Sequence, residues 1–208
     1  MVKLKGPSIS LGAAGSIGGS LVFATNKGRA YAKKLTKPAQ PQSAAQLGQR
    51  AITRWLSSYW GLIPAALQAF WLPLAADYDL PAYHAFLKFN LRRWSIYVAP
   101  TILYPPPAPN TAATLPTLSP VARLRTILLS PNYTVVNQNL GFVIHHSLAT
   151  GFTPTKANAI ACVTCVGVLK ERYIHGPLPS GTHYYRATPF TNGGWWGAPG
   201  AEESAVIP

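Results

Sequence analysis

Residues 1–40 read MVKLKGPSISLGAAGSIGGSLVFATNKGRAYAKKLTKPAQ, and the rest of the chain is organised around this glycine-rich arm. Glycine loses the most backbone entropy on ordering and has no side chain to bury. The arm should therefore be unable to build a core by itself. We expect a neighbouring copy of the same chain to hold it in place.

The arm is also basic, with seven lysines and arginines and no Asp or Glu. The whole chain of 208 residues has a net charge of +13, yet only 11% of its residues are charged and 48% are hydrophobic. Soluble domains usually carry about a quarter of charged residues. The composition therefore indicates a neutral surface that is buried between copies, and the excess of positive charge suits a polyanion or keeps the subunit soluble before assembly.

Two β-prone runs lie in the arm, at residues 20–25 and from Arg29 onward, and Asn26-Lys27-Gly28 connects them. A short connection that contains glycine predicts a β-hairpin. Residues 12–19 are typical of a flexible or extended tail, because no Gly-Lys-Ser/Thr ending marks a phosphate-binding loop.

Helical periodicity begins after this arm. Ser43 and Gln46 form a capping box, and apolar residues at four-residue spacing predict a helix over residues 44–59. Pro64 should open a second helix over residues 65–72, and Asp79 should cap a third helix over residues 80–93. The aromatic residues of these helices are interpreted as core.

Prolines 105, 106, 107 and 109 predict a semi-rigid spacer within residues 99–120. Beyond them, strand candidates separated by turns are typical of a β-sandwich. These candidates are residues 133–136, 140–146, 159–169, 184–190 and 204–207. The expected fold class is α+β, with an arm and hairpin at 1–40, a helical region at 41–98, the spacer, and a sandwich at 121–208.

The run Leu178-Pro179-Ser180-Gly181-Thr182-His183-Tyr184 resembles the Leu, Pro-Gly turn and Thr-x-Tyr pattern of fibronectin type III domains. The resemblance covers the last 75 to 90 residues. It implies a fibronectin III- or immunoglobulin-like sandwich that serves as an adhesion or spacer module and is not an enzyme. Its proline stands one position early, and Trp195 and Trp196 lie in the final loop, where we expect them to be exposed.

The first hundred residues are similar to uncharacterised small bacterial and phage-associated proteins that share a glycine-rich arm and tryptophan-rich helices. The matching residues are Gly18-Gly19, Gly28-Arg29, Lys37-Pro38, Pro41 and Ala45-Gln46. This resemblance implies that arm and helices form one unit, and it transfers no site.

No catalytic constellation, cofactor site or metal site is predicted. The five acids form no obvious pair. His145 and His146 should face opposite sides of a strand, as should Cys162 and Cys165, which makes each pair poorly suited to share a metal. The cysteines are interpreted as structural thiols of unknown redox state. Asn132-Tyr133-Thr134 matches the N-glycosylation pattern at Asn132, or is an ordinary turn.

We therefore expect a non-enzymatic subunit of a bacterial extracellular or surface filament, in which the arm adds a strand to a neighbour. The residues of the arm that we predict to contact the neighbour are Ile9, Leu11, Ile17, Gly18, Gly19, Leu21 and Phe23. A first alternative is a phage or nucleoprotein coat in which nucleic acid contacts Lys27, Arg29, Lys33 and Lys34. A second alternative is an adhesin that binds an acidic glycan. The sequence contains no run of 18 or more apolar residues, so no membrane-spanning helix is predicted. Residues 8–24 make a poor secretory signal.

Overall fold

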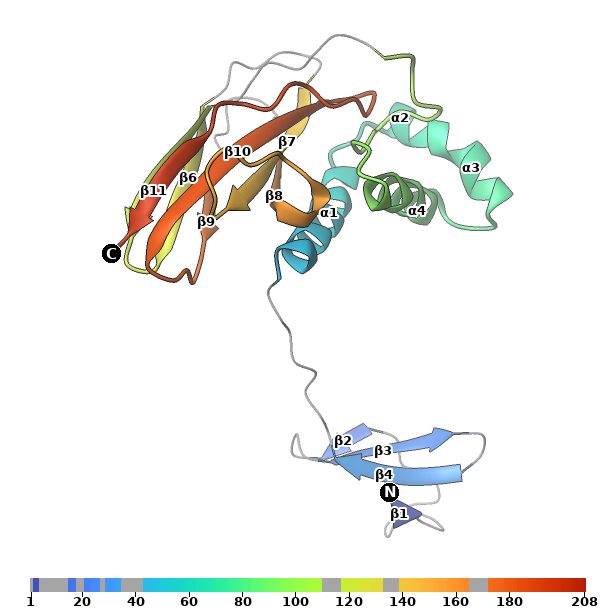
Figure 1. Ribbon diagram of the computed structural model, residues 1–208. Coiled ribbons are helices and arrows are strands. Elements are labelled where there is room, and N and C mark those ends of the chain that lie inside the picture. Colours follow the sequence, from blue (N-terminus) through green and yellow to red (C-terminus); the bar gives the residue numbers. More distant parts are fainter. Residues whose placement is uncertain are drawn as a thin grey trace. The chain divides into compact units, whose positions relative to one another are not determined.

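The computed structural model describes residues 2–3, 15–17, 21–26, 29–34, 43–109, 117–132, 139–164 and 172–208 (Figure 1). The chain forms two compact units, residues 1–41 and residues 42–208. The helices and the β-sandwich therefore belong to the same unit, and the arm is a unit of its own.

The first unit contains a four-stranded antiparallel sheet. Its strands are β1 (Val2–Lys3), β2 (Gly15–Ile17), β3 (Leu21–Asn26) and β4 (Arg29–Lys34), in the order β1-β4-β3-β2. The expected hairpin is β3 and β4, which pair from Asn26 opposite Arg29 to Leu21 opposite Lys34. Sequence periodicity did not reveal β1 and β2, because strands of two or three residues are too short to show an alternation.

The second unit contains a sandwich of two antiparallel sheets. The three-stranded sheet has the order β5-β6-β9, and the four-stranded sheet has the order β11-β10-β7-β8. The strands are β5 (Thr117–Arg123), β6 (Thr126–Asn132), β7 (Asn139–Ser147), β8 (Ala159–Thr164), β9 (Tyr173–His175), β10 (Gly181–Thr191) and β11 (Glu203–Ile207). A short 3₁₀ helix, η2 (Lys156–Asn158), precedes β8.

A helical layer lies beside the β11-β10-β7-β8 sheet of the sandwich, with α1 next to β8 (Figure 1). Its elements are α1 (Ala44–Trp60), α2 (Ala65–Gln68), the 3₁₀ helix η1 (Ala69–Trp71), α3 (Leu72–Asp77) and α4 (Ala82–Ser95). Helices and antiparallel sheets confirm the α+β fold class.

The first helix matches its prediction closely, but its N-terminus differs. Ser43 occupies the N-cap position without a side-chain capping hydrogen bond, and only its backbone oxygen accepts bonds from the amides of Gln46 and Leu47. The predicted capping box between Ser43 and Gln46 is therefore wrong. The third helix begins after Pro81, because Asp79 adopts a left-handed conformation with φ of 51° and cannot serve as its cap.

Gly48 lets α1 approach the sheet closely. A Cβ atom at this position would lie 2.7 Å from the backbone oxygen of Ala159, which is too close for any side chain. Farther along the helix, the Trp55 indole Nε1 donates a hydrogen bond of 2.9 Å to the Thr164 hydroxyl. These two contacts fix α1 against β8 at both ends of the strand.

Two hydrophobic cores result from the three layers. One core lies between the sheets and includes Ile127, Leu129, Phe142 and Tyr185. The other joins the helices to the four-stranded sheet. Strand β10 shows both environments, since its first residues alternate between buried and half-buried, whereas residues 187–191 are all buried. That continuous burial follows from the helical layer on the second face of the sheet.

The proline-rich stretch differs from the expected spacer in its described part, residues 99–109. Ala99 and Thr101 are fully buried. Asn90 on α4 accepts a 2.7 Å hydrogen bond from the Thr101 amide and donates one of 3.1 Å to the Thr101 carbonyl. This segment is therefore packed into the helical layer.

The tryptophan pair in the last loop is also less exposed than we expected. Trp196 is half-buried, its Nε1 donates to the Tyr97 carbonyl at 3.0 Å, and its ring contacts Trp94 and Phe190. Trp195 donates its Nε1 hydrogen bond to the Pro107 carbonyl. Both indoles therefore help to tie the loop to the helical layer, and they do not form a free binding surface.

Candidate functional site

The sheet of residues 1–41 holds three of the residues that we predicted to contact a neighbour. Ile17 pairs opposite Leu21, and Phe23 follows Leu21 by two positions. Because alternate residues of a strand share a face and directly opposed residues do too, these three lie on one face of the sheet. Ile9, Leu11, Gly18 and Gly19 lie outside the described residues.

The same face holds further apolar positions. Phe23 pairs opposite Ala32, which in turn pairs opposite Val2, so this face runs apolar across all four strands. A sheet with one apolar face must bury that face against another layer. The described residues of this unit all belong to the one sheet, so none of them forms a second layer over this face.

The predicted polyanion contacts divide between the two faces. Arg29 and Lys33 share one face of β4, and Lys3 joins them because it pairs opposite Tyr31. Lys34 pairs opposite Leu21, which places it on the apolar face. Lys27 lies outside the described residues. Sequence analysis missed Lys3 in this set, because only the β1–β4 register shows which face it occupies.

Asn132 is the last residue of β6 and pairs opposite Thr117. The residues that complete its glycosylation motif, Tyr133 and Thr134, lie outside the described part of the chain. Glycosylation of Asn132 stays a prediction.

The two histidines of strand β7, His145 and His146, lie on opposite faces of the sheet, as expected. His145 is fully buried, and its Nδ1 donates to the Asn158 side-chain oxygen at 2.9 Å and to the Thr155 carbonyl at 3.2 Å. Two oxygen acceptors at Nδ1 leave Nε2 to accept from the Tyr97 hydroxyl at 3.4 Å. Burial lowers the pKa of His145 to about 4, which keeps the ring neutral.

His146 meets two other histidines, which sequence spacing did not indicate. His183 donates from Nε2 to the Pro179 carbonyl at 3.0 Å, and its Nδ1 lies 2.9 Å from His146 Nε2. The His146 and His175 rings lie 4.6 Å apart, and His175 Nδ1 lies 3.0 Å from the Tyr185 hydroxyl. We call His146, His175, His183 and Tyr185 the histidine cluster.

Within the histidine cluster, burial favours the neutral form of the His146 and His175 rings. Burial, and after it the electrostatic effect of the neighbouring His183, lowers the pKa of His146 to about 4. Burial, followed by the charges of His146 and His183, lowers the pKa of His175 to about 3. Burial also raises the pKa of the Tyr185 hydroxyl. A general base works best with a pKa near the operating pH, so these groups are suited to a polar core that joins β7, β9 and β10.

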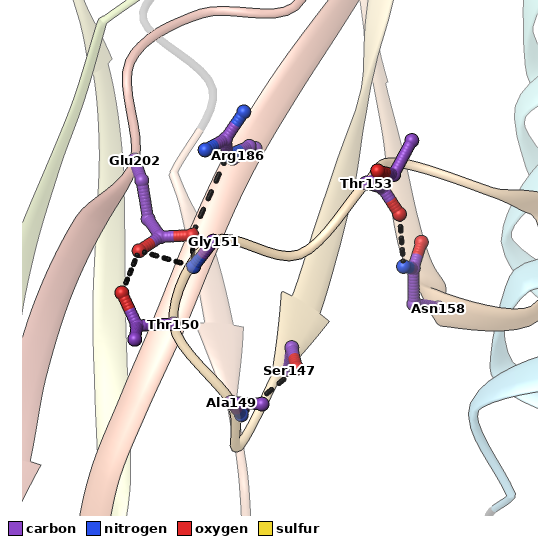
Figure 2. A network of polar contacts seen from close by, with 8 residues as sticks. All are labelled: Ser147, Ala149, Thr150, Gly151, Thr153, Asn158, Arg186 and Glu202. Carbon is purple, nitrogen blue, oxygen red and sulfur yellow. Dashed lines mark hydrogen bonds and ion pairs between the residues drawn. The ribbon is translucent and has the colours of Figure 1, made fainter.

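Glu202 organises the loop after β7 (Figure 2). Its carboxylate accepts from the Thr150 hydroxyl at 2.7 Å and from the Gly151 amide at 2.9 Å, and it lies 3.5 Å from Arg186 Nε. The hydrogen bonds from Thr150 and Gly151, together with the charge of Arg186, lower the pKa of Glu202. The sequence showed Glu202 only as an acid near the C-terminus, since its partners are far away in the chain.

The described residues include neither a set of metal ligands nor a membrane-spanning helix. No group of three or more His, Cys, Asp or Glu residues in that part of the chain is arranged to hold a metal ion. Cys162 lies half-buried on β8, and Cys165 is outside the described residues. Within the same ranges, no helix combines the length and apolar character that a bilayer crossing requires.

No known protein-family model matches the chain, and no curated protein matches it. Solved structures resemble about half of it. The chicken CNTN1 FN1-FN3 domains have 17% identity and a TM-score of 0.37, over 47% of this chain and 32% of that one. An Fn3-like protein from Clostridium thermocellum has 21% identity and a TM-score of 0.38, over 48% of this chain and 96% of that one.

A β-1,2-glucanase from Parabacteroides distasonis has 20% identity and a TM-score of 0.37, over 49% of this chain and 14% of that one. The chain thus spans about a third of the CNTN1 structure and a smaller share of the glucanase. The first two of these structures are described as fibronectin type III or Fn3-like domains.

Proposed function

We propose that this chain is a non-enzymatic structural subunit that assembles with copies of itself into a helical filament. The observation that carries the proposal is the sheet of residues 1–41, whose apolar face has no covering layer among the described residues of its own unit. In the filament, a neighbouring copy supplies that layer.

The composition supports the same conclusion. Only 11% of the residues are charged, so few charges oppose the burial of surface between subunits. A connecting unit that contacts a different surface on the next copy forms a heterologous contact, and such contacts propagate as open helices when the rotation does not close a ring. An extracellular bacterial location stays a prediction.

The test compares the full chain with a chain that lacks residues 1–19. That deletion removes β1 and β2, including Ile17, and leaves residues 42–208 intact. Sedimentation velocity should show large assemblies for the full chain and a monomer for the deletion. All six tryptophans lie in residues 55–196, so their fluorescence reports whether the second unit stays folded. A truncated chain that still polymerises would rule out residues 1–19 as the connector.

A second candidate function is a coat that binds nucleic acid. The observation that favours it is the face of the arm sheet that holds Lys3, Arg29 and Lys33 on the side opposite the apolar residues. Cations that neutralise phosphates make binding strongly dependent on salt. This function predicts co-purifying nucleic acid and assemblies that dissolve on nuclease treatment, whereas the filament predicts assemblies that resist nuclease.

A further inference from the structure

We propose that the surface of α4 around Lys88 and Arg92 is a binding site for a phosphate group, supplied either as free phosphate or by the backbone of a nucleic acid strand. This inference goes beyond the proposed function, because the site does not depend on assembly. It lies in the helical layer of the second unit, where α4 packs beside α3 (Figure 1).

A hollow of about 250 Å³ opens at this surface. Tyr78, which follows α3, and Ile96, which follows α4, form part of its wall. The remaining wall comes from α4 itself and consists of Lys88, Phe89, Arg92 and Arg93. Because sites for drug-sized ligands measure roughly 300–1,000 Å³, this hollow is suited to one small anionic group.

The three cations of the hollow have no carboxylate partner in the described part of the chain. The ion pair recorded there joins Arg186 to Glu202. Asp79, the acid closest to Lys88 in the sequence, lines a different hollow. Lys88 and Arg92 stand one helical turn apart on α4, and like charges at this spacing repel each other. An oxyanion between them relieves the repulsion and accepts charge-assisted hydrogen bonds from both.

Arg93 is held in place at the wall of the hollow. Its Nε donates a 2.8 Å hydrogen bond to the Ala99 carbonyl, and its Nη2 donates one of 2.7 Å to the Gly194 carbonyl. Among the described residues, none accepts a hydrogen bond from Nη1. Burial lowers the pKa of Arg93, and a nearby anion offsets this cost of burying its charge. The guanidinium is therefore positioned before a ligand arrives, which reduces the entropy cost of binding.

Aromatic rings orient the cations without neutralising them. The Lys88 Nζ lies 3.8 Å from the centre of the Tyr78 ring, which is a cation–π contact. The guanidinium carbon of Arg93 lies 5.8 Å from the centre of the Phe89 ring. Since a ring carries no net charge, both cations keep their attraction for an anion.

The spacing of charges on a helix does not by itself define this site. Arg50 and Arg54 have the same spacing on α1, but no described aromatic ring lines the hollow beside them. The helix dipole favours Arg92 and Arg93, which lie in the last turn of α4. That effect falls off within one turn, so it does not account for Lys88.

Equilibrium dialysis of the full chain against radiolabelled inorganic phosphate, at pH 7 and constant ionic strength, tests the site. Arg92→Gln should weaken phosphate binding by at least about tenfold, because it removes charge-assisted hydrogen bonds. Arg50→Gln is the matched control, since it removes the same charge from an exposed helical position, and it should bind like the wild type. Tryptophan fluorescence confirms that each variant is folded. Lys88→Gln replaces Arg92→Gln if that variant does not fold, and the same result is expected.

A second titration distinguishes the two sources of phosphate. The same proteins are titrated with a fluorescein-labelled single strand of oligodeoxythymidylate, and binding is followed by fluorescence anisotropy. A loss of affinity for the oligonucleotide in Arg92→Gln but not in Arg50→Gln assigns the site to backbone phosphates. A loss for inorganic phosphate alone assigns it to free phosphate. Saturable binding of neither probe, an unchanged affinity of Arg92→Gln for both, or equal losses in Arg92→Gln and Arg50→Gln would overturn the proposal.

Discussion

Acidification should destabilise the second unit through its buried histidines, and His145 gives the sharpest case. Its ring is fully buried between β7 and η2, with Asn158 and Thr155 as hydrogen-bond acceptors and Tyr97 as donor. No described carboxylate contributes to its pKa, which burial lowers to about 4. The unfolded chain therefore binds a proton at this residue at a higher pH than the folded chain does.

The magnitude follows from linkage. Histidine in an unfolded chain has a pKa of about 6.5, and each proton taken up on unfolding costs about 1.4 kcal/mol of stability per pH unit. The loss begins as the pH falls through about 6.5 and stops near the folded pKa of about 4. Between pH 7.5 and pH 5, His145 alone should lower the free energy of unfolding by about 2 kcal/mol.

Urea denaturation followed by tryptophan fluorescence measures this loss. The wild type, His145→Gln and His84→Gln are compared at pH 7.5 and pH 5. His145→Gln also loses hydrogen bonds, but that cost is the same at both pH values and cancels in the difference. The variant should therefore lose about 2 kcal/mol less than the wild type on acidification. His84→Gln removes an exposed ring on α4 and should behave like the wild type.

Equal losses for the wild type and His145→Gln, within about 0.5 kcal/mol, would refute this reasoning. They would mean that the folded and unfolded chains protonate His145 at the same pH. The burial that we infer for this ring would then be wrong.

Three further substitutions test the packing of the second unit by urea denaturation at pH 7.5. Gly48→Val should lower the free energy of unfolding by about 1–3 kcal/mol, because its side chain meets the Ala159 backbone; an unchanged stability would contradict the close approach of α1. Asn90→Ala should lower the free energy of unfolding by about 2–4 kcal/mol, because it removes the hydrogen-bond partner of the buried amide and carbonyl of Thr101. A loss below about 1 kcal/mol would contradict that role of Asn90. Glu202→Gln should reduce stability at neutral pH, and its difference from the wild type should shrink as the pH falls below the usual pKa range of a glutamate, because the lowered pKa of Glu202 makes the wild type lose stability there. A difference that is constant with pH would contradict the ionised network in Figure 2.

The sequence predicts α1, α4 and strands β7, β8, β10 and β11 because their side-chain periodicity reflects which layer buries them. Residues 44–59 show the apolar spacing of a helix and form α1, which extends to Trp60. In the second unit three strands were missed, in addition to β1 and β2 of the first unit. Strands β5 and β6 contain prolines, and β9 spans only three residues, so propensity argues against all of them and the surrounding sheet decides their structure.

Features that depend on contacts between residues far apart in the sequence were the least predictable. The prolines after residue 100 are typical of a free spacer, but the hydrogen bonds between Asn90 and Thr101 hold this part of the chain in the core. The histidine cluster likewise joins residues 146, 175 and 183, whose separations carry no local signal. For the arm, sequence identified the apolar and basic residues, and the register of β4 with its neighbours was needed to assign them to faces.

The central claim is that copies of this chain assemble through the unit of residues 1–41. Sedimentation velocity of the full chain beside the chain without residues 1–19, over a range of protein concentrations, tests it most directly. The account predicts large assemblies that grow with concentration for the full chain and a folded monomer for the deletion. A full chain that remains monomeric at every concentration, or a deletion that assembles equally well, would contradict it.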